Sequence, residues 1–295
     1  MEKVAAIDIG TNTVRLLVAK IDNGRLQVLE TGLVATRLGE GIGTGVLLSG
    51  AIERTIEALR YFLTVAGRRR VDRVIAVATS AVRDAANREE FLHRVKREVG
   101  LTVRVLSGVE EACLSYRGVM AGLLVDMSSA VVLDVGGGST ELIWAADGGP
   151  DYRSINVGAV RVTEGKYGRP EVAAILEPVL AEMRRFSLPS LIGVGGTVTT
   201  LAAVAQGLTV YSPQKIHGYC LSSEWVSFIL CQLESLSPAE RRLVPGLPQA
   251  WADIIVAGTL IVELVMKGLG QELLTASETG ILHGILLEEV ERKKY

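Results

Sequence analysis

Residues 133–142 read LDVGGGSTEL, and residues 4–14 read VAAIDIGTNTV. In both stretches an apolar run ends in an Asp, followed by an apolar residue, a Gly, a short polar turn and a second apolar run. The two aspartates, Asp8 and Asp134, lie 126 residues apart, which is too long for a solenoid repeat and fits a duplicated domain. Each copy predicts a hairpin of two strands joined by a tight turn.

The sequence around these two stretches predicts a mixed α/β fold. Short apolar strands such as residues 74–78 alternate with helical patterns. N-cap residues or capping boxes are predicted at Ser49, Asn87, Ser107 and Ser237. We expect two domains, residues 1–123 and 124–295, each with mixed β-sheets flanked by helices, and the last helix could pack back on the first domain. Because no low-complexity linker separates them, the domains should meet along an interdomain cleft.

Composition argues against several classes of protein. The chain has 31 Lys+Arg and 33 Asp+Glu, so its net charge of -2 argues against a nucleic-acid binder. Three histidines and three cysteines without metal-ligand spacing argue against a zinc site. The apolar segment 251–266 carries Asp253 and Glu263, which argues against a membrane span. Residues 1–10 lack a signal-peptide pattern, and we therefore expect a cytoplasmic protein.

Several turns combine glycines with hydroxyl groups, a composition that suits phosphate. Three of them are residues 10–13, 136–140 and 195–197. Glycines let backbone amides approach an anion closely, and successive N–H groups form a nest to which hydroxyls add further donors. A fourth turn, residues 79–83, supplies two hydroxyls and the guanidinium of Arg83. Any one of these could be an ordinary turn, but the set of four favours phosphate binding.

Two carboxylates flank the central glycine turn. Asp134 and Glu141 lie at opposite ends of the predicted hairpin turn, so their side chains can converge beside it. They would repel a phosphate unless a cation lay between them, and Mg²⁺ takes one or two carboxylates together with phosphate oxygens. Asp8 is the pseudo-symmetric partner and could reach the same ion. The alternative, in which Asp8 and Asp134 only hydrogen-bond their own turns, stays open.

Glu110 and Glu111 are expected to differ in role. Glu110 is the third residue after Ser107, so it completes a capping box. Glu111 has no such duty and could deprotonate a water for attack on phosphorus. A surface Glu that only stabilises the helix dipole is the alternative for Glu111.

Taken together, these motifs resemble a known family. The stretches DIGTNTVRLLV (8–18), ATSAVRDA (78–85), SGVEEACL (107–114), LDVGGGSTEL (133–142) and GVGGTVTTLAA (193–203) come in the order found in the exopolyphosphatase / guanosine pentaphosphate phosphohydrolase family. That family belongs to the acetate and sugar kinase, heat-shock cognate and actin superfamily. The resemblance covers nearly the whole chain and implies duplicated actin-like (ribonuclease H-like) domains, in the short two-domain form.

The resemblance also implies roles for individual residues. Glu111 resembles the catalytic base, and Asp134, Glu141 and Asp8 resemble the carboxylates that associate with Mg²⁺, with Mn²⁺ as an alternative. The expected phosphate-binding residues are Asn12, Thr13, Ser80, Arg83, Gly136, Gly137, Gly138, Ser139 and Thr140. The turn Gly195, Gly196 and Thr197 resembles the loop that meets a nucleotide in the superfamily.

The expected activity is Mg²⁺-dependent hydrolysis of terminal phosphoanhydride bonds in inorganic polyphosphate, with release of orthophosphate. The alternatives are a guanosine pentaphosphate 5′-phosphohydrolase and a sensor that binds nucleotide or polyphosphate without hydrolysis. Trp251 and Leu282 stand where the family usually has Arg, which favours polyphosphate over the nucleotide. No nucleic-acid or membrane partner is expected, and a homodimer is compatible with the sequence.

Overall fold

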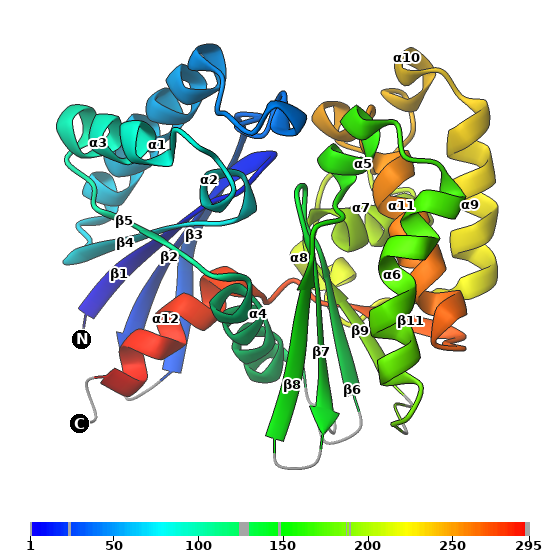
Figure 1. The fold of residues 1–295 in the computed structure, drawn as a ribbon. Coiled ribbons are helices and arrows are strands. Elements are labelled where there is room, and N and C mark those ends of the chain that lie inside the picture. Colours follow the sequence, from blue (N-terminus) through cyan, green and yellow to red (C-terminus); the bar gives the residue numbers. More distant parts are fainter. Residues whose placement is uncertain are drawn as a thin grey trace. The chain divides into compact units, whose positions relative to one another are not determined.

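The computed structural model describes residues 2–22, 25–123, 130–146, 149–186, 188 and 190–292, and the chain divides into two compact units (Figure 1). The first unit comprises Met1–Gly118 and Ile281–Tyr295, and the second comprises Val119–Gly280. The chain end therefore belongs to the first unit. The expected boundary after residue 123 adjoins residues 124–129, which lie outside the described residues.

A five-stranded sheet in the order β3-β2-β1-β4-β5 forms the first unit. Its strands are β1 (Glu2–Ile9), β2 (Thr13–Asp22), β3 (Arg25–Ala35), β4 (Arg73–Ala78) and β5 (Val103–Val105). The antiparallel pair β1–β2 confirms the first predicted hairpin and sets Asp8 opposite Arg15. β4 runs parallel to both β1 and β5. The carboxyl ends of β1, β4 and β5 therefore share one edge of the sheet.

The alternation along β1 sends its side chains to two cores. Ala5, Ile7 and Ile9 pack with Phe62 and other apolar residues of α1. Val4 and Ala6, on the opposite face, pack with α4 and α12. The helices of the first unit are α1 (Ser49–Arg69), α2 (Ser80–Arg83), α3 (Arg88–Val99), α4 (Gly108–Gly122), which continues into the second unit, and α12 (Ile281–Arg292). Because side chains alternate between the two faces along a strand, Asp8 lies on the same face of the sheet as Val4 and Ala6.

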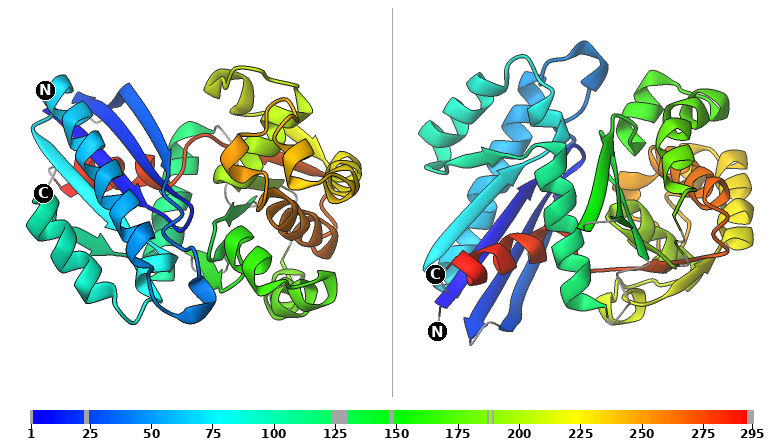
Figure 2. Two further views of the ribbon diagram at one scale, coloured as in Figure 1. Left: turned by 90° about the horizontal axis from the view of Figure 1, so that it is seen from above. Right: turned by 60° about the horizontal axis from the view of Figure 1, so that its bottom comes forward.

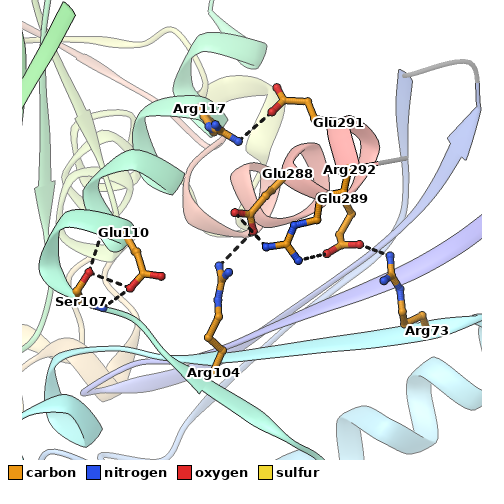
Figure 3. Close-up of polar contacts among 9 residues, drawn as sticks. All are labelled: Arg73, Arg104, Ser107, Glu110, Arg117, Glu288, Glu289, Glu291 and Arg292. Atoms are coloured by element: carbon orange, nitrogen blue, oxygen red, sulfur yellow. Dashed lines mark hydrogen bonds and ion pairs between the residues drawn. The ribbon is translucent and has the colours of Figure 1, made fainter. Parts of the chain in front are cut away.

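The last helix, α12, docks on the first unit through apolar contacts and ion pairs. Ile285 and Leu286 are buried in the core that α12 shares with β1 and β2, and Figure 2 shows α12 lying along this sheet. Gly284 meets α4 so closely that a Cβ there would lie 1.9 Å from the carbonyl oxygen of Leu114. Figure 3 shows the ion pairs on the polar side of the helix. They join Arg104 to Glu288, Arg73 to Glu289, Arg117 to Glu291, and Arg292 to both Glu288 and Glu289.

The sheet of the second unit repeats the plan of the first. Its order is β10-β11-β9-β6-β7-β8. The strands are β6 (Ala130–Val135), β7 (Thr140–Ala146), β8 (Gly149–Ile155), β9 (Ser190–Val194), β10 (Cys220–Ser222) and β11 (Leu273–Ala276). The antiparallel hairpin β6–β7 confirms the second predicted hairpin, and β9 runs parallel to β6 as β4 does to β1. The duplication seen in the sequence is therefore a duplication of sheet topology.

Helices cover the sheet of the second unit. They are α5 (Ala159–Gly165), α6 (Arg169–Met183), α7 (Gly196–Ala205), α8 (Pro213–Ile216), α9 (Ser223–Ser235), α10 (Pro238–Arg241) and α11 (Ile255–Gly268). The apolar helix α11 is a core helix, and its Glu263 is buried against Arg169 and Lys267. None of the helices among the described residues is long and apolar enough to cross a membrane.

The predicted helix caps are partly confirmed. Ser107 and Ser237 both form full capping boxes with the Glu three residues later. Ser49 is instead the first residue of α1, after the N-cap Leu48. Asn87 is the N-cap of α3 by position, but its amide bonds the N–H and the carbonyl of Leu47 rather than the helix. The capping-box prediction at Asn87 was therefore wrong, because a tertiary contact takes the side chain.

Candidate active site

The turn that follows β1 has its carbonyl groups tied down. Within the turn, Gly10 donates its N–H to the carbonyl of Thr13 at 2.9 Å. The carbonyls of Thr11 and Asn12 accept from the N–H groups of Gly39 and Arg37 at 2.7 and 2.9 Å. Gly39 permits this approach, because a Cβ there would lie 2.2 Å from a methyl carbon of Thr11. The carbonyl groups of the turn are thus already hydrogen-bonded within the protein. An anion would therefore bind to the N–H groups of the turn.

Buried polar atoms in this turn have no protein partner. Asn12 is 7% exposed, and neither atom of its amide has a hydrogen bond within the described part of the chain. Asp8 accepts from Arg15 Nε at 3.1 Å and Nη2 at 2.7 Å, both through Oδ2. Its other oxygen, Oδ1, is buried without a hydrogen bond to any described residue. Buried polar atoms cost free energy when unsatisfied, so these atoms suit a bound ligand.

The glycine turn of the second unit has the same design. Gly136 donates its N–H to the carbonyl of Ser139 at 3.0 Å, as Gly10 does to Thr13. The carbonyls of residues 136–138 accept from the first turn of α5 and from the Arg161 side chain. Gly158 lies against this turn as Gly39 lies against the first, since a Cβ on Gly158 would lie 2.6 Å from the Gly137 carbonyl. The duplication therefore extends to the hydrogen bonds that orient both turns.

Thr140 has a different environment from its neighbours in this turn. Its side chain is fully buried, and its hydroxyl donates to the carbonyl of Val157 at 2.6 Å. The hydroxyl proton is therefore used inside the protein. Thr140 therefore supports the turn, and its hydroxyl proton is already donated to Val157.

Asp134 and Glu141 face each other across the hairpin. They are directly paired in the β6–β7 register, so their side chains leave the same face of the sheet. Glu141 is 1% exposed and accepts from the Ser154 hydroxyl at 2.7 Å. Asp134 reaches the start of α7, where a Cβ on Gly195 would lie 2.7 Å from Asp134 Oδ1. Gly195 has a φ of 92°, so both its conformation and this contact require glycine.

This carboxylate pair is chemically suited to Mg²⁺. No group of three or more His, Cys, Asp or Glu side chains with metal-binding spacing occurs in the described ranges. Mg²⁺ does not need such a group, because it binds through one or two carboxylates and completes its shell with water and phosphate oxygens. Two facing carboxylates beside a glycine turn, one of them almost completely buried, fit that requirement.

Glu111 and Arg83 form an ion pair in the first unit. Arg83 Nη1 donates to Glu111 Oε2 at 2.7 Å and to the carbonyl of Leu106 at 3.2 Å. Glu111 is only 8% exposed. The predicted base and the predicted phosphate-binding cation are thus in contact. No local pattern in the sequence indicates this contact, because the two residues lie 28 residues apart.

The neighbouring Glu110 performs the capping role expected of it. Its Oε2 accepts from the N–H and the hydroxyl of Ser107, both at 2.8 Å (Figure 3). The backbone N–H bond from Ser107 and then the hydroxyl bond lower the pKa of Glu110 below its usual value. The division of roles between the two glutamates is therefore confirmed for Glu110, and the role of Glu111 stays a prediction.

Backbone contacts gather the first-unit residues at one edge of the sheet. The N–H of Thr79 donates to the carbonyl of Ile9 at 3.2 Å, and that of Leu106 donates to Ala78 at 2.9 Å. The Asp8 turn, α2 and the start of α4 are therefore successive neighbours. The predicted site residues gathered here are Asp8, Asn12, Thr13, Ser80, Arg83 and Glu111.

The second unit gathers its own set at the equivalent edge. The carboxyl ends of β6 and β9 are adjacent because the strands run parallel, with Asp134 paired to Val194. The residues gathered here are Asp134, Gly136, Gly137, Gly138, Ser139, Thr140, Glu141, Gly195, Gly196 and Thr197. The carboxyl edge of parallel strands is where ligands bind in open α/β sheets.

Arg15 and Arg37 lie beside the predicted site residues Asp8 and Asn12 but are not among the residues predicted from the sequence. The hairpin register would have indicated Arg15, since it lies directly opposite Asp8. Arg37 has a φ of 52°, and among the described residues the other non-glycine residues with positive φ, Arg70 and Lys166, are helix C-caps. No sequence signal predicted this backbone conformation of Arg37, which lies beside Asn12.

Comparison with known proteins supports the fold and shows the family. A model of the Ppx/GppA phosphatase family matches residues 17–293. Exopolyphosphatase 2 of Mycobacterium tuberculosis is 33% identical, over 97% of this chain and 98% of that protein. The crystal structure of an exopolyphosphatase from Cytophaga hutchinsonii has a TM-score of 0.90 and 28% identity, over 99% of this chain and 98% of that one.

A further relative is larger than this chain. The bifunctional 3-dehydroquinate synthase/phosphatase of Fusobacterium nucleatum is 30% identical over 98% of this chain. The match covers 47% of that protein, so this chain spans about half of its length.

The two mixed sheets, each with a hairpin, a glycine turn and flanking helices, define a protein of the duplicated actin-like fold. This confirms the predicted fold class. The chain belongs to the Ppx/GppA phosphatase family, as the resemblance implied.

Proposed function

We propose that this protein hydrolyses the terminal phosphoanhydride bond of inorganic polyphosphate and releases orthophosphate. One observation carries the proposal. A single sheet edge of the first unit holds a turn with unsatisfied buried polar atoms, at Asp8 and Asn12, beside a nearly buried carboxylate, Glu111, that Arg83 orients. The names of the relatives support polyphosphate as the substrate. Two relatives that match this chain over almost their whole length are named exopolyphosphatases.

In this proposal the chain's own groups bind phosphate and activate water. The amides of the turn, the Asn12 side chain and the Thr13 hydroxyl donate to oxygens of the terminal phosphate. Glu111 accepts a proton from a water as the water oxygen bonds to phosphorus, and the bridging P–O bond breaks. The electrons of that bond stay on the oxygen of the shortened chain. Arg83 holds the Glu111 carboxylate and offsets negative charge.

We propose that Asp134 and Glu141, which face each other across the β6–β7 hairpin of the second unit, hold Mg²⁺, or Mn²⁺ in its place. The bound cation would supply neutralisation of the phosphate charge. Asp8 of the first unit stays a predicted ligand, and Arg15 already neutralises it through Oδ2.

Phosphate release from long-chain polyphosphate, measured with and without Mg²⁺, tests this function. The expected result is release of orthophosphate one unit at a time, with no phosphoryl acceptor required. Guanosine pentaphosphate should be assayed in parallel. Faster release from the nucleotide would favour the 5′-phosphohydrolase, and tight binding of either compound without release would favour a sensor.

A further inference from the structure

The indole of Trp251 covers the start of helix α7. A Cβ on Gly196, the first residue of that helix, would lie 3.1 Å from Trp251 Nε1 and 3.4 Å from Cζ2. The three atoms nearest to this position all belong to Trp251. Trp251 is 8% exposed and packs in a cluster with Val160, Leu247 and Ile254. The ring is therefore fixed in the space directly above Gly196.

The turn beneath this ring has the features of a phosphate site. It joins β9 to α7 through Gly195, whose φ of 92° turns the chain sharply into the helix. N–H groups at such a helix start bind phosphate well. The indole nitrogen of Trp251 is the atom nearest to the Gly196 Cβ position. The N–H donor of a nearly buried side chain thus lies beside this turn.

A nucleotide held by its phosphates at such a turn needs open space beside it for the ribose and base. Pockets for such ligands are concave and enclose most of the ligand surface. Here the indole and its cluster take up the space over Gly196. A phosphate group needs only the N–H donors and not that space.

We infer that Trp251 is a specificity-determining residue that excludes a nucleoside from the turn before α7 and leaves the turn to phosphate groups that carry none. The inference rests on the proposed function and narrows its substrate class to chains of phosphate without a nucleoside.

The test is to remove the ring and measure binding of a nucleotide. Guanosine 5′-triphosphate is titrated into the full chain, and its dissociation constant is compared among variants by calorimetry. Trp251→Ala should bind it at least about 10-fold more tightly than the wild type, which corresponds to about 1.4 kcal/mol. Trp251→Phe keeps most of the bulk and should exclude the nucleotide as the wild type does.

Leu247→Ala is the matched control. Leu247 belongs to the same cluster and is 6% exposed. None of the three atoms nearest to the Gly196 Cβ position belongs to Leu247. This variant should lose stability without gaining nucleotide affinity. Trp251→Leu, a smaller truncation, replaces Trp251→Ala if the alanine variant does not fold.

Two results would overturn the inference. One is a folded Trp251→Ala or Trp251→Leu with unchanged nucleotide affinity, and the other is a wild type that already binds the nucleotide as tightly as those variants. Failure of the proposed function gives a different result. In that case the wild type releases no phosphate from polyphosphate, while the Trp251 variants still gain affinity for the nucleotide.

Discussion

Glu110 and Glu111 are adjacent in sequence, yet the structure gives them different environments. Glu110 bonds only one helical turn back, to Ser107, whereas Glu111 contacts Arg83 from another element. One position along a helix turns a side chain by about 100°, so neighbours face different surroundings. This difference makes the pair a matched test of catalysis.

We expect Glu111→Gln to lower kcat on polyphosphate by about 10²–10⁴-fold, because the amide keeps the size of the side chain but cannot accept the proton. KM should change little. Glu110→Gln is the control and should keep its kcat. Steady-state assays of both variants decide the matter, and a Glu111→Gln enzyme with near wild-type turnover would remove Glu111 from the mechanism.

The sequence predicted those side-chain contacts whose two partners lie within a few residues of each other in the chain. The Ser107–Glu110 bond spans three residues and follows from helix geometry alone. The bond from Arg83 to Glu111 spans 28 residues and requires β4 and β5 to lie side by side, which no local pattern specifies. The Asn87 amide likewise contacts Leu47, 40 residues away, and the capping prediction failed there.

The pH dependence of the Glu110 capping box can be predicted in sign. Its bonds to Ser107 lower the pKa of Glu110 in the folded state. The stabilisation is therefore present above the unfolded pKa and is lost as the pH falls through the folded pKa. Urea unfolding should show Glu110→Gln less stable than the wild type by about 0.5 kcal/mol at pH 7, and this difference should shrink as the pH falls through the folded pKa. A difference that stays the same from pH 7 into the acid range would contradict this.

At the scale of elements, the hairpin β6–β7 is the unit that brings the two candidate metal ligands together. Its register pairs Asp134 with Glu141, and the sequence predicted this because the turn length fixes which residues face each other. β3 was not predicted. It is the edge strand of its sheet and half exposed, so it lacks the apolar pattern by which β1 was recognised.

We expect Asp134→Asn and Glu141→Gln each to raise the Mg²⁺ concentration needed for half-maximal activity by about 10-fold or more, since each removes a charged oxygen ligand. Asp151→Asn on β8 is the control, because Asp151 is paired with Arg153 away from the turn. Titration of Mg²⁺ in the polyphosphate assay measures the effect. Full activity of the wild type in excess chelator would refute the metal assignment.

At the scale of the whole molecule, the first unit is discontinuous in sequence. Its last helix, α12, pairs with residues 174 to 216 positions earlier in the chain. The sequence pattern allowed α12 to pack on the first domain but could not specify it, because an amphipathic helix fits any apolar surface. The buried contacts of Ile285 and Leu286 with β1 and β2 show where its apolar face lies.

The ion pairs of α12 should differ in their contribution to stability according to burial. The Glu289 side chain is 7% exposed and contacts both Arg73 and Arg292, whereas Glu291 is 59% exposed and contacts Arg117 (Figure 3). Glu289→Gln weakens charge-assisted hydrogen bonds at a nearly buried side chain, whereas the exposed Glu291–Arg117 pair is screened by water. Glu289→Gln should therefore lower the free energy of unfolding by about 1–3 kcal/mol, and Glu291→Gln by less than about 0.5 kcal/mol.

Urea unfolding followed by circular dichroism measures both variants under the same conditions. The Glu289→Gln effect should persist in 1 M salt better than any effect of Glu291→Gln, because salt screens exposed charges more than buried ones. Equal losses for the two variants would mean that burial does not govern these contacts. The docking of α12 on the first unit would then depend mainly on its apolar face, Ile285 and Leu286, which Leu286→Ala would test at an expected cost of about 2–5 kcal/mol.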